Sequence, residues 1–410
     1  LDIARAQLAL GAHREALAAL RSYRGPPGGE IAALEATARA ALGEKDEAKK
    51  VLASATEREP ATGSLHLATA RLALSERDFD GALAAVDKAL AATPDGDTAA
   101  TRTARLLKGQ ILLAAQRPAD AVAEFEQVTA TKSDDVEGLA GLAEALLVQQ
   151  RLDEATPVVE RLRKAAPKPM GTRLLQGWLA YAKGDLSAAD TALAEVLVAA
   201  PTHPGALLMA ADSAFRQDKF AQAESLLGTF RKQYPDHLPA DRLLAAVLLK
   251  QRRAPEAIAL LEPVAAAADA DAGTHALLGH AYFEAGDAKK GEAALAAAQR
   301  LAPDSTVLKA QRAVGRLMAG GGAGELDELE AIVDAAPEAA GPRQALTFMQ
   351  LLGGDKDAAL ASARALVALR PKDPMAHNLL GVAAAEAGDE TAARSALEKA
   401  LAIDPAFAPA

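Results

Sequence analysis

Prolines recur every 34 residues through most of this chain, and this period limits the possible folds more than any other feature. The prolines of this ladder are Pro26, Pro60, Pro94, Pro167, Pro201, Pro235, Pro303, Pro337, Pro371 and Pro405. Ser133 and Asp269 occupy two positions where the period calls for proline. A fixed period of this length indicates repeated supersecondary units, each packed on its neighbours. We therefore predict one continuous domain over 1–410, with repeats ending near residues 28, 60, 94, 133, 167, 201, 235, 269, 303, 337, 371 and 405.

The composition favours helices within each repeat. Half of the residues are hydrophobic but only 3% are aromatic, so alanine and leucine supply the apolar surface. Both are strong helix formers. Proline at the end of a repeat cannot extend a helix, because it lacks the N–H group and restricts the residue before it. The one irregular step, 39 residues from Pro94 to Ser133, predicts a small inserted loop at Asp95–Ala99.

Small residues and turn residues divide each repeat into two helices. Gly-Asp pairs at 184–185, 286–287 and 388–389 combine a turn former with an aspartate that can cap the second helix. Small side chains at matching positions permit close approach of the two helices. They are Gly177, Gly279 and Gly381 in the first helix, and Ala155, Ala189, Ala223, Ala257 and Ala393 in the second. The sequence therefore predicts an all-α array of helical hairpins.

The complete pattern resembles the tetratricopeptide repeat over essentially all 410 residues. It is most evident from Leu278-Gly279 through Gly286-Asp287 and Gly291 to Pro303. The resemblance implies a right-handed superhelical solenoid of about twelve helix-turn-helix repeats, without catalytic function, whose concave groove binds a protein or peptide segment. Leu174 and Leu208 occupy fifth positions where the peptide-clamping subclass has polar residues, so that clamp is not expected.

In this family the second, fifth, ninth, twelfth and thirteenth positions of each first helix tend to face the groove. The candidate partner-binding residues that follow from this register are Trp178, Tyr181, Asp212, Phe215, Arg216, Arg242, Lys250, His280, Phe283, Glu284, Gln344, Phe348 and Asn378. Packing between adjacent hairpins is an equal alternative to a place in the groove for Tyr181, Phe215 and Phe283. Trp178, at a ninth position, is expected to be more exposed than these three.

Several segments also resemble one bacterial group, the tetratricopeptide-repeat lipoproteins of the PEP-CTERM/exosortase system. They are Leu260–Val264, Ala276–Tyr282, Pro374–Gly381 and Ala392–Leu401. The resemblance implies a periplasmic scaffold that serves exopolysaccharide assembly or export, or PEP-CTERM sorting. It also implies a membrane tether, for which an anchor in the outer membrane is one possibility. The lipidated N-terminal Cys of that group is not in this sequence. The alternatives are a cytoplasmic adaptor or regulator unrelated to polysaccharide, and the binding portion of a larger enzyme.

Both ends of the sequence predict a longer array. Leu1 begins partway through a first helix, and Ala406–Ala410 resemble the start of another unit. We therefore expect the chain to be a segment of a larger protein. Without an initiating Met, the missing signal sequence does not argue for the cytoplasm.

Charge and hydropathy narrow the classes of partner. The formal net charge is −10 and the basic residues form no stripe, so nucleic acid is not an expected partner. No run of eighteen uncharged apolar residues occurs, so no transmembrane span is expected. The chain has no Cys, which excludes disulfides and thiolate metal sites within it.

The remaining motifs do not indicate a cofactor, a metal or an enzyme. The run Gly320–Gly324 follows no strand and lacks the Lys-Ser/Thr of a phosphate loop, so we expect a loop between two helices. Gly25–Gly29 is expected to be a connector between repeats. His203 and His237 lie at equivalent turns, but no carboxylate at ligand spacing joins them. No nucleophile-elbow or zinc-protease motif is present.

Overall fold

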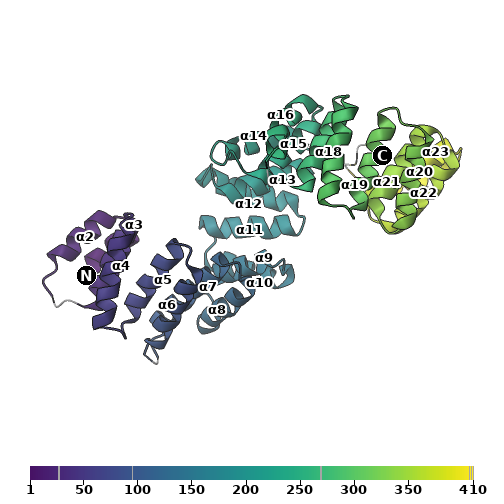
Figure 1. The fold of residues 1–410 in the computed structure, drawn as a ribbon. Coiled ribbons are helices and arrows are strands. Elements are labelled where there is room, and N and C mark those ends of the chain that lie inside the picture. The colour runs from purple at the N-terminus through teal and green to yellow at the C-terminus, as the bar shows by residue number, and fades with distance from the viewer. Residues whose placement is uncertain (26–27, 95, 268–269, 406, 408, 410) are drawn as a thin grey trace. The chain divides into compact units, whose positions relative to one another are not determined.

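The computed structural model describes residues 1–25, 28–94, 96–267, 270–405, 407 and 409, and over these residues the chain is helical, without a strand (Figure 1). The chain divides into two compact units, Leu1–Ser213 and Ala214–Ala410. The boundary falls within helix α13 (Pro204–Arg216). The predicted all-α class is confirmed, whereas the single continuous solenoid stays a prediction.

Twelve helices precede α13 in the first unit. They are α1 (Asp2–Ala9), α2 (His13–Ser22), α3 (Gly29–Ala41), α4 (Lys45–Arg58), α5 (Gly63–Ser75), α6 (Phe79–Ala91), α7 (Thr98–Ala114), α8 (Pro118–Thr131), α9 (Val136–Val148), α10 (Leu152–Ala165), α11 (Met170–Ala182) and α12 (Leu186–Ala199).

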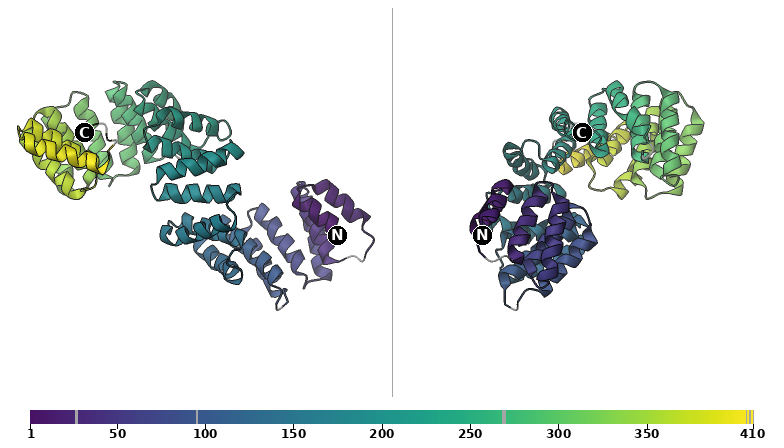
Figure 2. Two further views of the ribbon diagram at one scale, coloured as in Figure 1. Left: turned by 180° about the vertical axis from the view of Figure 1, so that it is seen from behind. Right: turned by 60° about the vertical axis from the view of Figure 1, so that its left-hand side comes forward.

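Eleven helices follow α13 among the described residues of the second unit. They are α14 (Phe220–Arg231), α15 (Leu238–Lys250), α16 (Ala254–Ala265), α17 (Ala272–Glu284), α18 (Ala288–Leu301), α19 (Thr306–Met318), α20 (Ala323–Ala335), α21 (Ala340–Gly353), α22 (Lys356–Leu369), α23 (Pro374–Glu386) and α24 (Glu390–Ile403). Within each unit the helices form successive hairpins, in which a first helix of odd number packs against a second helix of even number. Figure 2 shows the ribbon of these hairpins from two further sides.

The local signals in the sequence set the ends of the second helices. Asp185 accepts a hydrogen bond from the Ala188 N–H at 3.0 Å and so caps α12, and Asp287 and Asp389 cap α18 and α24 in the same way. Helix α18 ends two residues before Pro303. The predicted caps are confirmed. Pro26 and Asp269, two positions of the ladder, lie outside the described residues.

The irregular repeat lengthens a helix more than it lengthens a loop, so the predicted loop at Asp95–Ala99 is only partly right. Gly96 and Asp97 precede α7, but Thr98 and Ala99 lie inside it, and Asp95 is outside the described residues. Helix α7 has 17 residues, whereas α5 and α9 have 13 each. Four extra residues add about one helical turn, which keeps the buried face of α7 aligned with its neighbours.

The two glycine-rich segments are also shorter as loops than predicted. Helix α20 begins at Ala323, so Gly324 is already helical and only Gly320–Gly322 form the turn. Helix α3 begins at Gly29, within the predicted connector Gly25–Gly29. Pro26 and Pro27 of that connector are outside the described residues.

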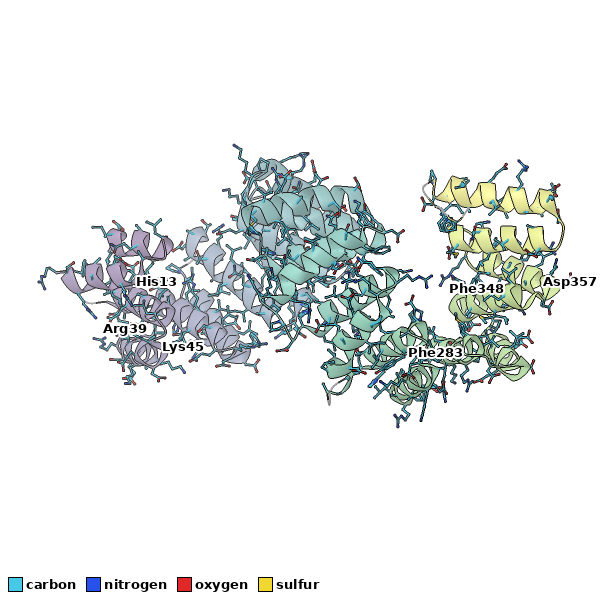
Figure 3. All side chains as sticks on the ribbon, turned by 90° about the horizontal axis from the view of Figure 1, so that it is seen from above. His13, Arg39, Lys45, Phe283, Phe348 and Asp357 are labelled. Carbon is cyan, nitrogen blue, oxygen red and sulfur yellow. The ribbon has the colours of Figure 1, made fainter. Side chains whose placement is uncertain are left out.

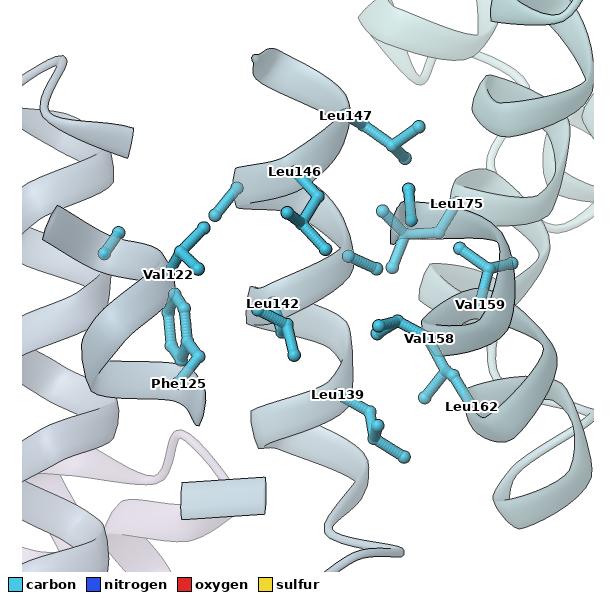
Figure 4. Close-up of a cluster of buried hydrophobic side chains, with 14 of the residues drawn as sticks. Val122, Phe125, Leu139, Leu142, Leu146, Leu147, Val158, Val159, Leu162 and Leu175 are labelled. Carbon is cyan, nitrogen blue, oxygen red and sulfur yellow. The ribbon is translucent and has the colours of Figure 1, made fainter. Parts of the chain in front are cut away.

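Each hairpin shares its apolar core with the next one. Figure 4 shows this for the first unit, where α9 lies between α8 on one side and α10 and α11 on the other. Its Leu139, Leu142 and Leu146 meet Phe125 of α8 and Leu162 of α10 in one buried cluster. Stability in such an array comes from contacts between neighbouring repeats.

The small residues at matching positions act as spacers, as predicted. Ala189 and Ala257 are completely buried. A Cβ atom added to Gly279 would lie 2.7 Å from Cγ of Leu295 in the partner helix, and one added to Gly381 would lie 2.7 Å from Cγ of Leu397. Neither site has room for a larger side chain.

One residue in most first-to-second-helix turns has a left-handed backbone, and in several hairpins it is not glycine. Gly184 and Gly286 have φ of 81° and 83°, whereas the equivalent Gln116 and Gln150 have φ of 57° and 58°. A non-glycine residue in this region costs about 1–2 kcal/mol. Since Gln150 is exposed, its side chain offers little packing in return.

We therefore expect Gln150→Gly to raise the free energy of unfolding by about 1 kcal/mol, part of the relief being offset by the greater chain entropy of glycine. Urea unfolding followed by circular dichroism measures the change. The reverse substitution, Gly184→Gln, is the matched control and should destabilise the chain. A stabilising effect of both substitutions would contradict the argument.

Candidate functional site

The second unit contains a cleft of about 1060 Å³ whose walls come mainly from the first helices α17, α19, α21 and α23. Most of the lining side chains are apolar. They include Val307, Val314 and Met318 of α19, Phe348 of α21, and Met375 and Leu379 of α23. Several remain open to solvent, since Val307, Met318 and Phe348 are 48%, 67% and 47% exposed.

The cleft follows the register of the repeat. Its lining recurs at 34-residue intervals, as in Ala276, Ala310 and Gln344, and in His280, Val314 and Phe348. These sets are the fifth and ninth positions of successive first helices. Second, fifth, ninth and thirteenth positions lie on one face of a helix because they are three or four residues apart. Stacked repeats therefore present the same face to a common cleft.

Five of the predicted partner-binding residues line this cleft. They are His280, Phe283, Glu284, Gln344 and Phe348. Phe348 and His280 are exposed, and Phe283, Glu284 and Gln344 are half-buried (Phe283 and Phe348 are labelled in Figure 3). The register thus brings these side chains together, and their role in binding stays a prediction.

Asn378 does not line the cleft, contrary to its predicted place in the groove. It is buried in α23, and its Oδ1 atom accepts no hydrogen bond from a described residue. The neighbouring Met375 and Leu379 reach the cleft instead. Burial of this fifth-position side chain depends on the hairpin packed beside it, which the position number does not encode.

A smaller pocket of about 440 Å³ adjoins the cleft within the second unit. It is lined by Phe215, Ala246, Leu249, Lys250, Arg252, Leu277, His280 and Glu284. Arg252, His280 and Glu284 also line the larger cleft, so the two hollows are adjacent. Lys250 is exposed at the end of α15, and Nη1 of Arg252 lies 2.9 Å from Oε1 of Glu284. This end of the site therefore carries most of its charge.

Arg242, another predicted groove residue, joins two repeats instead of lining either hollow. Its Nη1 donates to Oδ2 of Asp271 at 2.6 Å. Burial raises the pKa of Asp271, but the Thr274 N–H and hydroxyl, which donate to Oδ1 at 2.8 Å each, and the charge of Arg242 outweigh this effect and hold the pKa below its usual value. The pair secures the start of α17 to α15.

The twelfth-position aromatic residues make packing contacts, but Phe283 also lines the cleft and Phe215 the smaller pocket, so packing and a place in the site do not exclude each other. A Cβ atom added to Gly315 of α19 would lie 2.4 Å from the Phe283 ring, which shows how closely that ring meets the next repeat. Phe215 packs against Phe220, with ring centroids 6.0 Å apart. In the first unit, the Tyr181 hydroxyl donates to Oδ2 of Asp212 at 2.6 Å. Arg216, at a thirteenth position, is exposed.

Trp178 is not the exposed anchor that its ninth position predicts. It is half-buried and packs against the core cluster of α7–α11. A large ring on α11 can cover the apolar residues of the preceding repeat, and burying that surface is favourable. Tyr181, Phe215 and Phe283 are half-buried as well, so greater exposure of Trp178 than of these three stays a prediction.

The sequence interpretation missed the aliphatic wall of the cleft. Val307, Val314 and Met318 occupy second, ninth and thirteenth positions of their repeat, so the register itself identifies them. Aliphatic residues at helical spacing are usually core residues, so the sequence alone does not distinguish these three from a core. In the structure Val307 and Met318 are exposed, Val314 is half-buried against the core of α19–α21, and all three line the cleft.

The two histidines considered as metal ligands are helix caps. Nδ1 of His203 accepts from the Ala206 N–H at 3.2 Å, and Nδ1 of His237 accepts from the Ala240 N–H at 3.2 Å. Within the described residues, no group of three or more His, Cys, Asp or Glu side chains could hold a metal ion. Nor does that part of the chain contain a helix long and apolar enough to cross a membrane.

The fold and the cleft define a helical-hairpin repeat protein with an open apolar surface formed by its first helices. Family models described as Tetratricopeptide repeat match residues 34–97, 112–176, 208–272, 272–305 and 352–406, which together cover more than half of the chain. The chain belongs to the tetratricopeptide repeat proteins. No curated protein matches it.

Solved structures similar to this chain include three with low sequence identity. A tetratricopeptide repeat protein from Parabacteroides merdae is 12% identical, with a TM-score of 0.46 over 63% of this chain and 99% of that one. The Cut9-Hcn1 hetero-tetramer of the APC/C is 14% identical, with a TM-score of 0.48 over 93% of this chain and 88% of that one. The human IFIT1 dimer with m7Gppp-AAAA is 15% identical, with a TM-score of 0.47 over 97% of this chain and 94% of that one. At these scores the likenesses carry no argument about the ligand of this chain.

Proposed function

We propose that this chain is a non-catalytic interaction scaffold whose second unit binds a segment of a partner protein in the apolar cleft. The observation that carries the proposal is the exposure of Val307, Met318 and Phe348 in one hollow of about 1060 Å³. Soluble proteins rarely leave contiguous apolar surface open unless it binds something. Aromatic side chains such as that of Phe348 often act as anchors in such interfaces.

The proposal extends to a compartment and a pathway. The resemblance of Leu260–Val264 and Pro374–Gly381 to exosortase-system lipoproteins supports a periplasmic, membrane-tethered scaffold that serves exopolysaccharide assembly or export, or PEP-CTERM sorting. A cytoplasmic adaptor is the competing function. The identity of the bound partner separates the two, because a partner of the envelope machinery would support the first.

The test is photo-crosslinking in cells of the source organism, with benzoylphenylalanine at position 348 and identification of the captured protein. We expect Phe348→Asp to weaken binding of that protein at least about 10-fold, because the loss of a buried phenyl ring is worth about 1.5–3 kcal/mol and each 1.4 kcal/mol is a factor of ten. Isothermal titration with the purified partner measures the change.

The matched control is Leu301→Asp, which places the same charge at an exposed apolar position of the second helix α18, where it does not line the cleft. This variant should bind like the unaltered chain. Equal affinity of the Phe348→Asp variant and the unaltered chain for every captured protein would overturn the proposal.

A further inference from the structure

The charged groups of the composite site gather at one end. The apolar cleft is lined along α19 and α21 by Val307, Val314, Met318 and Phe348, and none of its charged lining residues comes from these helices. Arg252 and Glu284 supply the charge, and both border the smaller pocket. A ligand that fills both hollows must therefore be apolar along most of its length and polar at the end near α15 and α17.

The balance of charge at that end is positive, although the chain as a whole is acidic. Lys250 is exposed and forms no ion pair with a described residue. Arg252 is 86% exposed, so its pairing with Glu284 leaves most of the guanidinium open to solvent, whereas Glu284 is largely covered. His280 is exposed between the two hollows and can add a further donor.

We propose that the cleft of the second unit recognises a segment of a partner protein in which bulky apolar side chains are followed, at one end, by one or two carboxylates. This inference rests on the proposed function and deepens it. The apolar side chains lie against α19 and α21, and the carboxylates face Lys250 and Arg252. Two cations beside an apolar surface favour a carboxylate over an ammonium group and fix the direction of the segment.

Nucleic acid fits the site less well than such a segment. Single strands are held by stacking platforms and a basic groove along the backbone. Here the cations occupy only one end, next to a long aliphatic wall, and the net charge of −10 repels a polyanion.

The test is selection of a random dodecapeptide display library on the purified 410-residue chain. We expect enrichment of peptides with at least two bulky apolar residues and an Asp or Glu at one end. For the best of these, replacing the acidic residues with Lys should lower affinity at least about 10-fold in fluorescence anisotropy. Selection on the Lys250→Glu/Arg252→Glu variant should enrich the same apolar residues with Lys or Arg at that end.

Three further arms make the outcome decisive. A Lys250→Gln/Arg252→Gln variant should lose the charge preference and keep apolar binding. A Lys289→Glu/Lys399→Glu variant changes two exposed lysines that line neither hollow, and it changes the net charge by as much as Lys250→Glu/Arg252→Glu does. It should select the same peptides as the unaltered chain. Phe348→Asp should select no apolar peptide; if it selects as well as the unaltered chain does, the proposed function itself fails.

The charge inference is overturned if the unaltered chain and the Lys250→Glu/Arg252→Glu variant select peptides with the same charges, and binding of both sets of peptides is lost in Phe348→Asp. It is also overturned if a fluorescein-labelled 12-nucleotide oligoadenylate binds the unaltered chain, loses binding in that variant, and is not displaced by any selected peptide.

Discussion

Replacing Phe125 with Ala is expected to lower the free energy of unfolding of the first unit by about 3–5 kcal/mol. The ring is fully buried in α8 and is held between the backbones of two other helices. A Cβ atom added to Gly109 of α7 would lie 2.5 Å from the ring, and one added to Gly141 of α9 would lie 2.4 Å from it. Because glycines face the ring from α7 and α9, neither helix has a side chain at these two contacts that could fill the cavity left by the ring.

Urea unfolding monitored by circular dichroism measures this loss. The two units and their repeats need not unfold together, so the transition of the first unit is assigned with a probe on that unit, such as the fluorescence of Trp178, the only tryptophan. Phe348→Ala is the matched control, because it makes the same change at an exposed position and should have a much smaller effect. Equal losses for the two variants would contradict the packing described for Phe125.

The fold was predictable because its signals are local and repeated. An aspartate such as Asp185 caps a helix through atoms three residues away, and a proline such as Pro303 ends a helix through its own ring, so neither depends on distant parts of the chain. The five residues added to one repeat were harder to place. Period alone counts them without showing whether they extend a loop or a helix, and here Asp97 caps a helix that begins at Thr98.

The candidate site was predictable only as a set of helix positions. The register identifies a shared face, but the exposure of each side chain depends on the size of residues in the next hairpin. Trp178 covers a neighbouring core and Asn378 is enclosed, although both occupy groove positions. Val314 and Met318 would pass for core residues in a single helix, and only stacking of successive repeats leaves them on the wall of a cleft.

A second large effect is expected from an ion pair that joins two repeats of the first unit. Asp135 precedes α9, and its side chain is only 2% exposed. Arg102 of α7 donates to both of its oxygens, at 2.5 and 2.9 Å, and to Glu137 at 2.6 Å. The Gly138 N–H also donates to Oδ1 of Asp135 at 2.9 Å, so the same carboxylate caps α9. Burial raises the pKa of Asp135, but Arg102 and the Gly138 N–H outweigh it and hold the pKa below its usual value.

We expect Arg102→Ala to lower the free energy of unfolding at neutral pH by about 2–3 kcal/mol. Removing one partner of a fully buried pair costs about 3–5 kcal/mol, and the cost is smaller here because Arg102 is 37% exposed and water can reach the site. The Asp135 carboxylate would then be buried with the Gly138 N–H as its remaining hydrogen-bond donor among the partners described above.

The pH dependence of the stability loss in Arg102→Ala follows from the lowered pKa of Asp135. It separates loss of the ion pair from simple loss of packing. A carboxyl group whose pKa is lowered on folding stabilises the protein above its unfolded pKa of about 3.9, and this contribution is lost as the pH falls through the folded value. In the Arg102→Ala variant, burial without the guanidinium favours the protonated acid. The difference in unfolding free energy between the two proteins should therefore shrink as the pH is lowered from 7 to about 3.

Arg151→Ala is the matched control. It removes an arginine of equal exposure from its surface pair with Glu154, and should change stability little at any pH. A difference for Arg102→Ala that stays constant over this range would show that the arginine acts through its methylene groups and not through the charge on Asp135.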